Sequence, residues 1–181
     1  GLAGSCGFID MSVPEYHVMI SNCPFFFRST LNLGRITADN STLYMNENTT
    51  LTIRQNFLIG NKSTFHLNGG SHVAVGEELA VTTGSTVLVL SVNNKLEIDE
   101  RWAGAGGFIR AEHVLVDATS KITADSKGYA AVIGLDGAGP GGGKMLNRTG
   151  GGGGYGGRGA DGSNLPGSGG QAYGSPLTPL D

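Results

Sequence analysis

The sequence predicts an all-β protein: a right-handed parallel β-helix with about 22 residues per coil, followed by a glycine-rich C-terminal segment. Three observations predict this fold. Apolar residues recur at an interval of 22, they alternate with polar residues in short runs, and helix signals are nearly absent. A fixed period of this size is typical of stacked repeats, in which neighbouring units bury a continuous core.

The repeat is clearest between residues 41 and 81. Six apolar positions return 22 residues later, and the pairs are Leu43 and Phe65, Met45 and Leu67, Leu51 and Val73, Ile53 and Val75, Phe57 and Leu79, and Ile59 and Val81. Within one unit these residues stand two apart in pairs, which is the strand period. We therefore expect three short strands per coil, with these side chains inside. An antiparallel sandwich also has short strands, but it has no reason to keep this recurrence.

The N-terminal segment, residues 1–33, does not follow the period. It is predicted to be a cap or a joint to a preceding module, because the end of a β-helix exposes unpaired strand edges. The cluster from Phe25 through Phe26 to Phe27 is expected to pack in the core and lid, with an exposed aromatic contact for a partner as the alternative.

Two cysteines, Cys6 and Cys23, lie close together in this segment. If the chain is secreted, we expect them to form a disulfide that holds the N-terminal segment in place. Two buried thiols are the alternative.

Residues 34–133 are predicted to form the body of the coil. The segment Arg35 to Asp39 returns in nearly the same form as Lys121 to Asp125, at an interval of 86, which is close to four coils. We therefore expect the two segments, and with them Asp39 and Asp125, to occupy equivalent positions about four coils apart.

The third repeat departs from the strict period. Leu96 and Ile98 come one residue late, which we attribute to a longer corner, and a loop insertion containing Trp102 follows over residues 99–107. Strands are expected to resume at Phe108, at Val114 and at Ile122.

Residues 134–181 form the third predicted segment. Between residues 134 and 174 there are 19 glycines, and large apolar side chains are few. This composition does not build an ordinary core. Two hypotheses stay open: an ordered glycine-rich wrap against the coil, and a flexible linker.

Charge and hydropathy exclude some partners. The formal net charge is −3, only 15% of residues are charged, and lysine and arginine are scattered singly, so we expect no nucleic-acid partner. No apolar run approaches the roughly 18 residues of a membrane span, so no membrane insertion is expected. The chain begins with Gly1 and shows no signal peptide, so we expect a processed form or, in preference, a fragment of a longer chain.

Four sequons for N-glycosylation occur, at Asn40, Asn48, Asn61 and Asn147. The first three fall next to predicted corners of the coil, where a glycan would be exposed. Their presence favours an extracellular or cell-surface location. The alternative is that asparagine is simply a favoured turn residue.

Signals for catalysis, metal binding and cofactor binding are weak. Glycoside hydrolysis needs two facing carboxylates, and Asp39 and Asp125 would be too far apart in the predicted coil. The acidic residues around Glu97 form the main acidic concentration. His66 and His72 are expected to point outward without a third metal ligand. We predict no catalytic residue, no metal site and no cofactor.

The C-terminal third resembles a known class of sequence. The passages concerned are residues 122–129, 137–143, 150–159 and 172–176. They resemble the glycine-rich segments of very large secreted or cell-surface proteins of algae, stramenopiles and plants, which alternate with predicted β-helix coils. The resemblance implies a structural role, in a wall, a sheath or an extracellular fibre such as a flagellar hair.

These observations together predict a non-enzymatic extracellular structural glycoprotein module that self-associates into a fibre or joins neighbouring modules of a longer chain. The alternative is an adhesin or carbohydrate-binding module. Its interaction surface would consist of Phe25, Phe26, Phe27 and Trp102. A polysaccharide lyase or hydrolase is the third hypothesis.

Overall fold

The computed structural model describes residues 8–10, 16–92, 97–98, 101–102, 104–125, 127–129, 135–146, 149–154, 157–164 and 166–173. Over these residues the protein is all-β, without a helix. The chain divides into two compact units. The first comprises residues 1–92 and 106–125, and the second comprises residues 93–105 and 126–181.

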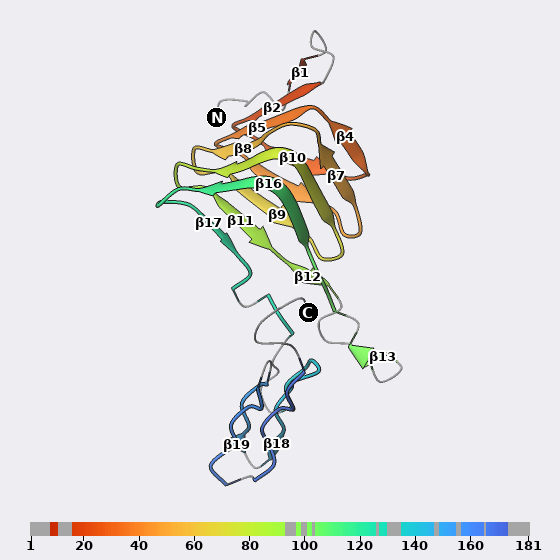
Figure 1. Ribbon diagram of the computed structural model, residues 1–181, viewed down its shortest axis with the longest axis vertical. Coiled ribbons are helices and arrows are strands. Elements are labelled where there is room, and N and C mark those ends of the chain that lie inside the picture. The colour runs from red at the N-terminus through yellow and green to blue at the C-terminus, as the bar shows by residue number, and fades with distance from the viewer. Residues whose placement is uncertain are drawn as a thin grey trace. The chain divides into compact units, whose positions relative to one another are not determined.

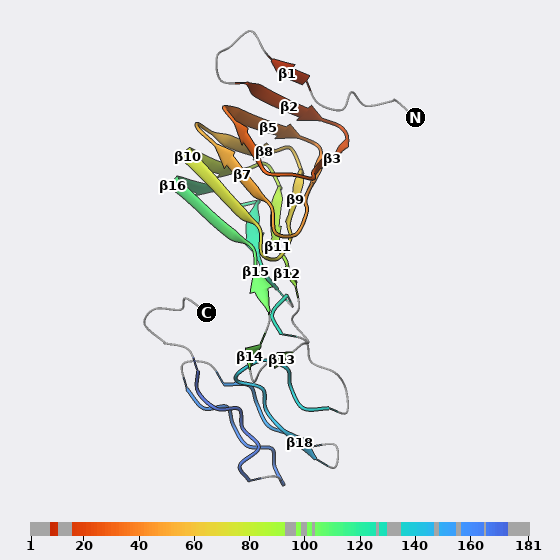
Figure 2. The same cartoon turned by 90° about the vertical axis from the view of Figure 1, so that its right-hand side faces the viewer.

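The first unit is a parallel β-helix whose stacked coils of about 22 residues make about three turns. Figures 1 and 2 show the coils stacked in chain order from β2 to β16. Each complete coil contributes strands to three faces. Face 1 consists of β2 (His17–Ser21), β5 (Arg35–Asp39), β8 (Phe57–Gly60) and the C-terminal parts of β10 (His72–Val81) and β16 (Phe108–Val116). Face 2 consists of β3 (Pro24–Phe27), β6 (Thr42–Met45), β9 (Thr64–Leu67), β11 (Thr86–Val89) and β17 (Lys121–Thr123). Face 3 consists of β4 (Leu31–Leu33), β7 (Thr50–Ile53) and the N-terminal parts of β10 and β16.

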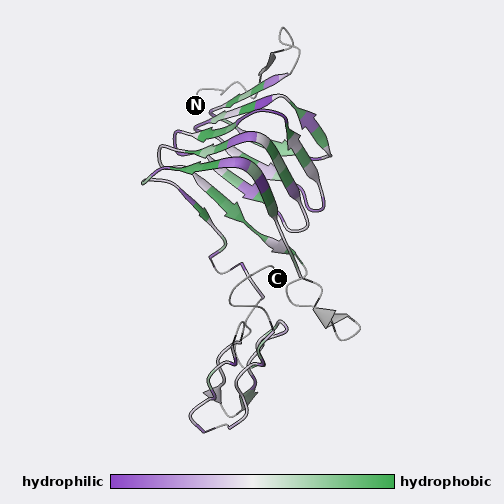
Figure 3. Ribbon diagram, in the orientation of Figure 1, coloured by the Kyte–Doolittle hydropathy of each residue, from purple (hydrophilic) through white to green (hydrophobic). Residues whose placement is uncertain are grey.

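The strand register confirms the predicted repeat. Leu43 pairs with Phe65 in β6 and β9, Leu51 with Val73 in β7 and β10, and the other four predicted pairs are also register partners. All twelve side chains are buried. Because alternate residues of a strand point to opposite sides, the twelve residues fill the coil while their neighbours face outward. Figure 3 shows this alternation of hydrophobic and hydrophilic positions along the strands.

The coil begins earlier than the predicted boundary at residue 34. β2 pairs in parallel with β5, and His17 is the partner of Arg35. The offset is 18 residues between β2 and β5, 21 between β5 and β8, and 22 between β6 and β9. This difference explains why the period did not reveal the first coil. β1 (Phe8–Asp10) then adds to the outer edge of β2 in the antiparallel direction.

The predicted equivalence of Arg35 to Asp39 with Lys121 to Asp125 is wrong. The first segment forms β5 on face 1, between β2 and β8. The second begins with β17, which pairs with β11 on face 2. The match is a local similarity between two strands on different faces of the coil, and Asp39 and Asp125 do not belong to one column of stacked residues.

The position of the insertion also differs from the prediction. The chain leaves the coil after β12 (Ser91–Val92), and face 3 resumes with β16, where Phe108 pairs with His72. Ile98 does not join the coil, because β13 (Glu97–Ile98) pairs with β14 (Arg101–Trp102) in a separate antiparallel hairpin. Leu96 lies outside the described residues. β15 (Ala105–Gly106) precedes the return, and the resumption of strands at Phe108, Val114 and Ile122 is confirmed.

The second unit is held together mainly by backbone hydrogen bonds between extended glycine-rich segments. β18 (Met145–Leu146) and β19 (Thr149–Gly150) form a short antiparallel pair. Beyond it, Gly151 donates to the Lys144 carbonyl at 2.9 Å and Gly154 donates to the Gly141 carbonyl at 2.8 Å. Pairing at every third residue is the spacing of a helix with three residues per turn and no internal hydrogen bonds, the polyproline-II type.

Further segments join this bundle in the same way. Gly152 donates to the Ala160 carbonyl, Gly159 to the Gly170 carbonyl, and Gly170 back to the Gly152 carbonyl. A Cβ at Gly159 or Gly170 would overlap a backbone carbonyl of a neighbouring segment. Glycine is therefore required here by the close approach of the backbones. The wrap of this segment against the coil stays a prediction.

Candidate interaction surfaces

The three consecutive phenylalanines of β3 have different environments. Phe27 is 1% exposed in the core, where its ring contacts Phe65 edge-on with centroids 6.3 Å apart. Phe25 is half-buried and packs edge-on against Phe27. Phe26, between them, points outward and is 48% exposed. Strand alternation separates the three, so only Phe26 is available to a partner.

Phe26 is the first ring of a stacked column on the outside of face 2. Its centroid lies 4.8 Å from that of Tyr44 at an interplanar angle of 13°. Tyr44 stacks in turn on His66 at 4.7 Å and 18°. Sequence reasoning missed Tyr44 as a member of this surface. The offset of 22, which the sequence shows, connects Tyr44 with His66, whereas the offset of 18 between Phe26 and Tyr44 is seen only in the structure.

Uncharged polar side chains flank the aromatic column. A column of half-buried threonines runs beside the rings and consists of Thr42, Thr64 and Thr86. On their strands, Thr42 comes two residues before Tyr44, and Thr64 comes two residues before His66. Arg28 lies over the outer ring, with its Cζ 5.6 Å from the Phe26 centroid. The rings stack on one another, so the column presents ring edges and the outer parts of offset ring faces. Such a surface offers apolar contact with hydroxyl groups close by.

The predicted partner surface also included Trp102. This residue belongs to β14, and its side chain lies outside the described part of the structure. Cys6 also lies outside the described residues, so the disulfide stays a prediction. Cys23 is buried at the first corner of face 2, where its N–H donates to the hydroxyl of Ser41 at 3.3 Å.

Asparagines occupy the corners between faces 1 and 2. Asn22, Asn40 and Asn61 all have positive φ, between 44° and 54°. Asparagine tolerates this left-handed conformation better than most residues do. Their side chains also connect coils: the Asn40 amide donates to Asn22 at 2.7 Å, and the Asn61 amide donates to Asp39.

The predicted exposure of the sequon asparagines Asn40, Asn48 and Asn61 is confirmed. Asn48 lies at another corner, also with positive φ. The conformation accounts for asparagine at these corners whether or not a glycan is attached. Asn147 lies outside the described residues, and glycosylation of all four stays a prediction.

Several aspartates connect neighbouring segments of the backbone. The Thr83 N–H donates to Asp117 at 2.6 Å and the Thr119 N–H at 2.9 Å. The backbone N–H of Thr83, with the Ser120 and Thr119 hydroxyls, holds the pKa of Asp117 well below its usual range. Each donor stabilises the ionised carboxylate. Asp117 thus fastens the last corner to the coil before it.

Asp161 has the same role in the glycine-rich unit. It accepts hydrogen bonds from the Gly169 N–H at 2.8 Å and from Arg158 at 2.7 Å. Backbone donors, first Gly167 and then Gly169, lower the pKa of this carboxyl, and Arg158 adds to the effect. Asp136 accepts from the Met145 N–H at 2.6 Å. These carboxylates accept hydrogen bonds from main-chain N–H groups and so connect neighbouring segments.

The described residues contain no group of three or more His, Cys, Asp or Glu side chains that could hold a metal ion. His72 is exposed and His66 half-buried in the aromatic column, so the predicted outward direction of both is confirmed. The side chain of Glu97 is not described.

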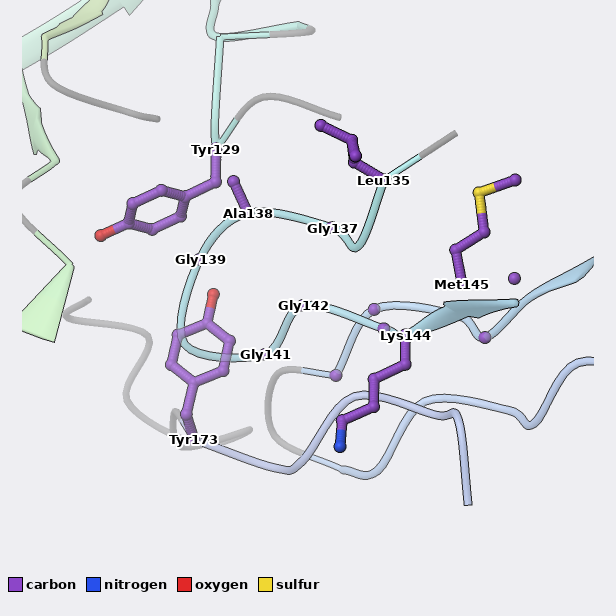
Figure 4. Close-up of a pocket in the computed structure, with 15 residues that line it drawn as sticks. Tyr129, Leu135, Gly137, Ala138, Gly139, Gly141, Gly142, Lys144, Met145 and Tyr173 are labelled. Carbon is purple, nitrogen blue, oxygen red and sulfur yellow. The ribbon is translucent and has the colours of Figure 1, made fainter. Parts of the chain in front are cut away.

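A hollow of about 420 Å³ lies within the glycine-rich unit. Figure 4 shows Tyr129 and Tyr173 beside the glycine turn from Gly139 to Gly141, with Met145 on the other side of the hollow. A Cβ at Gly139 would overlap the Tyr129 ring, and one at Gly141 would overlap the ring of Tyr173 and a neighbouring carbonyl. The two tyrosine rings therefore pack directly against the backbone of Gly139 and Gly141, which favours a structural role for both rings.

No protein-family model, curated protein or solved structure matches this chain. Among the described residues, no helix is long and apolar enough to cross a membrane.

Proposed function

We propose that this chain is a non-enzymatic structural module of an extracellular glycoprotein assembly, such as a fibre, a cell-surface appendage or a wall. One observation carries the proposal: both units are lattices of stacked, hydrogen-bonded segments, and the carboxylates of Asp117, Asp136 and Asp161 accept hydrogen bonds from the main chain of these lattices. Asp117 fastens two coils and Asp161 fastens two glycine-rich segments. A module built in this way acts mechanically, because every coil is joined to the next along three faces.

The exposed sequons support the extracellular part of the proposal. Glycans at Asn40, Asn48 or Asn61 would project from corners of the coil, where they would keep its sides soluble. The resemblance of the glycine-rich segment to large wall and fibre proteins points the same way.

The experiment is an intact-mass measurement of the protein from its native source, before and after treatment with a glycosidase. We expect a loss of mass that corresponds to one or more N-glycans. The replacement of Asn48 by Gln should lower the mass by at most one glycan. If every sequon variant keeps the glycan mass of the wild type, the proposal of an extracellular glycoprotein is contradicted. Negative-stain images of the native material should show filaments or sheets, and discrete soluble particles would contradict the fibre.

A carbohydrate-binding module is the second candidate, and the stacked column of Phe26, Tyr44 and His66 favours it. The stacked rings and the flanking threonine hydroxyls suit a neutral glycan. The test is retention on immobilised neutral polysaccharides. Phe26→Ala should abolish retention, whereas Met19→Ala, at an equally exposed residue on face 1, should leave it unchanged. Equal retention of both variants would remove this candidate.

A further inference from the structure

The three sequons of the coil differ in the hydrogen bonds of the groups that glycosylation uses. All three asparagines, Asn40, Asn48 and Asn61, are exposed and have positive φ. A glycan is attached to the side-chain amide nitrogen, Nδ2, and the sequon requires a hydroxyl group two residues further on. A sequon of the folded coil therefore suits a glycan where both of these groups are free.

The amide nitrogens of Asn40 and Asn61 are both engaged. Asn40 Nδ2 donates to the Asn22 side-chain oxygen at 2.7 Å, and Asn61 Nδ2 donates to the Asp39 carboxylate. Asn22 donates in turn to the Ser21 hydroxyl at 2.8 Å, and that hydroxyl donates to Asp39 at 3.3 Å. This network joins three successive coils. A saccharide on either nitrogen would replace one of its protons and bring a bulky group against the neighbouring coil.

The hydroxyl of the Asn61 sequon is engaged as well. Ser63 is 0% exposed. Its hydroxyl accepts from the Ser41 N–H at 3.1 Å and donates to the Gly60 carbonyl at 2.6 Å. In the folded coil, the sequon of Asn61 therefore offers neither of the two groups.

Asn48 has a different environment. A Cβ at Gly70, where φ is 72°, would overlap the carboxamide oxygen of Asn48, so this oxygen packs against the next coil. The nitrogen lies on the opposite side of Cγ and is directed away from Gly70. Within the described part of the chain, neither the Asn48 nitrogen nor the hydroxyl of Thr50 has a hydrogen-bond partner.

We propose that Asn48 is the residue of the coil that carries the N-glycan, and that Asn40 and Asn61 stay unmodified and hold their corner together. In this modification Nδ2 of Asn48 forms a bond to the anomeric carbon of an activated saccharide. The bond from that carbon to its phosphate leaving group breaks, and the nitrogen gives up one proton. The carboxamide oxygen keeps its place on Gly70, so the glycan costs the coil no hydrogen bond.

This inference rests on the proposed extracellular function, for which it names the modified residue. In the unfolded chain the three sequons are alike, because none of these hydrogen bonds exists there. The folded coil distinguishes them, since a glycan at Asn40 or Asn61 weakens the network between coils. Folded protein is therefore enriched in chains that are modified at Asn48 alone among the three.

The test is site mapping of the whole protein from its native source. A glycosidase that acts in water enriched in heavy oxygen converts each glycosylated asparagine to a labelled aspartate, and peptide mass spectrometry locates the label. We expect the label at Asn48 and none at Asn40 or Asn61. A label at Asn40 or Asn61, or a glycosylated protein without a label at Asn48, would overturn this assignment and leave the extracellular function standing. A protein without a label at any sequon would overturn the extracellular glycoprotein itself.

A matched pair of variants tests the same assignment without a change of asparagine. Thr50 and Thr42 are half-buried threonines that begin β7 and β6, and each supplies the hydroxyl of one sequon. In the chain expressed as a secreted protein, Thr50→Ala should remove the whole glycan mass of the coil. Thr42→Ala should keep the glycan mass of the wild type. Loss of the glycan in Thr42→Ala, or its retention in Thr50→Ala, would also overturn the assignment.

Discussion

The β-helix and the glycine-rich unit both join extended segments by main-chain hydrogen bonds, but their interiors differ. The coil encloses large apolar side chains, among them Phe57 and Phe65, which contact each other edge-on. The buried positions of the glycine-rich unit are glycines such as Gly141 and Gly170, together with Ser168. The coil therefore gains its stability from apolar burial, whereas the glycine-rich unit depends on backbones that approach without side chains between them.

The largest effect is expected from a cavity in the coil. Phe57→Ala removes a fully buried ring, and the free energy of unfolding should fall by about 3–5 kcal/mol. The measurement is urea-induced unfolding followed by circular dichroism. The neighbouring Leu58 points outward and is exposed, so Leu58→Ala should cost about 0.5 kcal/mol or less. Equal losses for the two variants would contradict the assignment of the inside of the coil.

The corresponding change in the glycine-rich unit adds a group instead of removing one. Gly170→Ala places a methyl group against the Gly141 carbonyl, and the local free energy of opening should fall by about 1–3 kcal/mol. Amide exchange at Gly152 and Gly154 should accelerate, while the amides of the coil stay protected.

The matched control for that substitution is Gly157→Ala. No described atom lies within 4 Å of a Cβ added at Gly157. The change should leave amide exchange as it is, or slow it slightly, because alanine restricts the unfolded chain. If both alanine variants exchange like the wild type, close backbone packing does not hold this unit together.

The same difference explains what the sequence could predict. Between Leu43 and Val81 the corners have constant length, so side chains that stack also recur at a constant interval, and both the register and the core follow from the sequence. The first coil has shorter corners, and the pairing of β2 with β5 was therefore missed. After Val92 the chain leaves the coil, which breaks the period. The short match between the segments that begin at Arg35 and at Lys121 then suggested a wrong equivalence.

The glycine-rich unit was beyond prediction for a different reason. Its pairing is between backbones, and glycine carries no pattern of apolar and polar side chains that would show which segment lies against which. Outward columns were only partly predictable. Phe26 was proposed as part of an aromatic cluster, but its stacking on Tyr44 depends on the offset of 18 between the first coils.

A smaller effect is expected from the serine column at the corners of the coil. The buried Ser63 hydroxyl accepts from the Ser41 N–H at 3.1 Å and donates to the Gly60 carbonyl at 2.6 Å. Ser63→Ala leaves that N–H buried without its acceptor and should cost about 1 kcal/mol or slightly more. The Ser85 hydroxyl, one coil later, is buried without a hydrogen-bond partner among the described residues. Ser85→Ala should therefore be neutral, and a cost equal to that of Ser63→Ala would contradict the hydrogen bonding of this column.

The smallest effect concerns the dependence of stability on pH, and it compares one carboxylate from each unit. The pKa values of Asp117 and Asp161 are lowered in the folded protein by backbone donors, first Thr83 for Asp117 and first Gly167 for Asp161. A group with a lowered folded pKa stabilises the protein above the unfolded pKa, near pH 4, and this contribution is lost as the pH falls through the folded value. The unfolding midpoint of the wild type should therefore decrease as the pH is lowered from about 5 to 2.

Asparagine at either position removes the charge and retains an oxygen acceptor. In Asp117→Asn, the unfolding midpoint of the coil should decrease less than in the wild type as the pH is lowered. In Asp161→Asn, only amide exchange in the glycine-rich unit should become less dependent on acid pH. Each variant should differ from the wild type mainly above pH 4, where the wild-type carboxylate is charged in both states. Because both carboxylates are accessible to solvent, water weakens their interactions, and the changes should be smaller than those of the core and glycine variants. If both variants respond to acid pH as the wild type does, other carboxyl groups determine the loss of stability in acid.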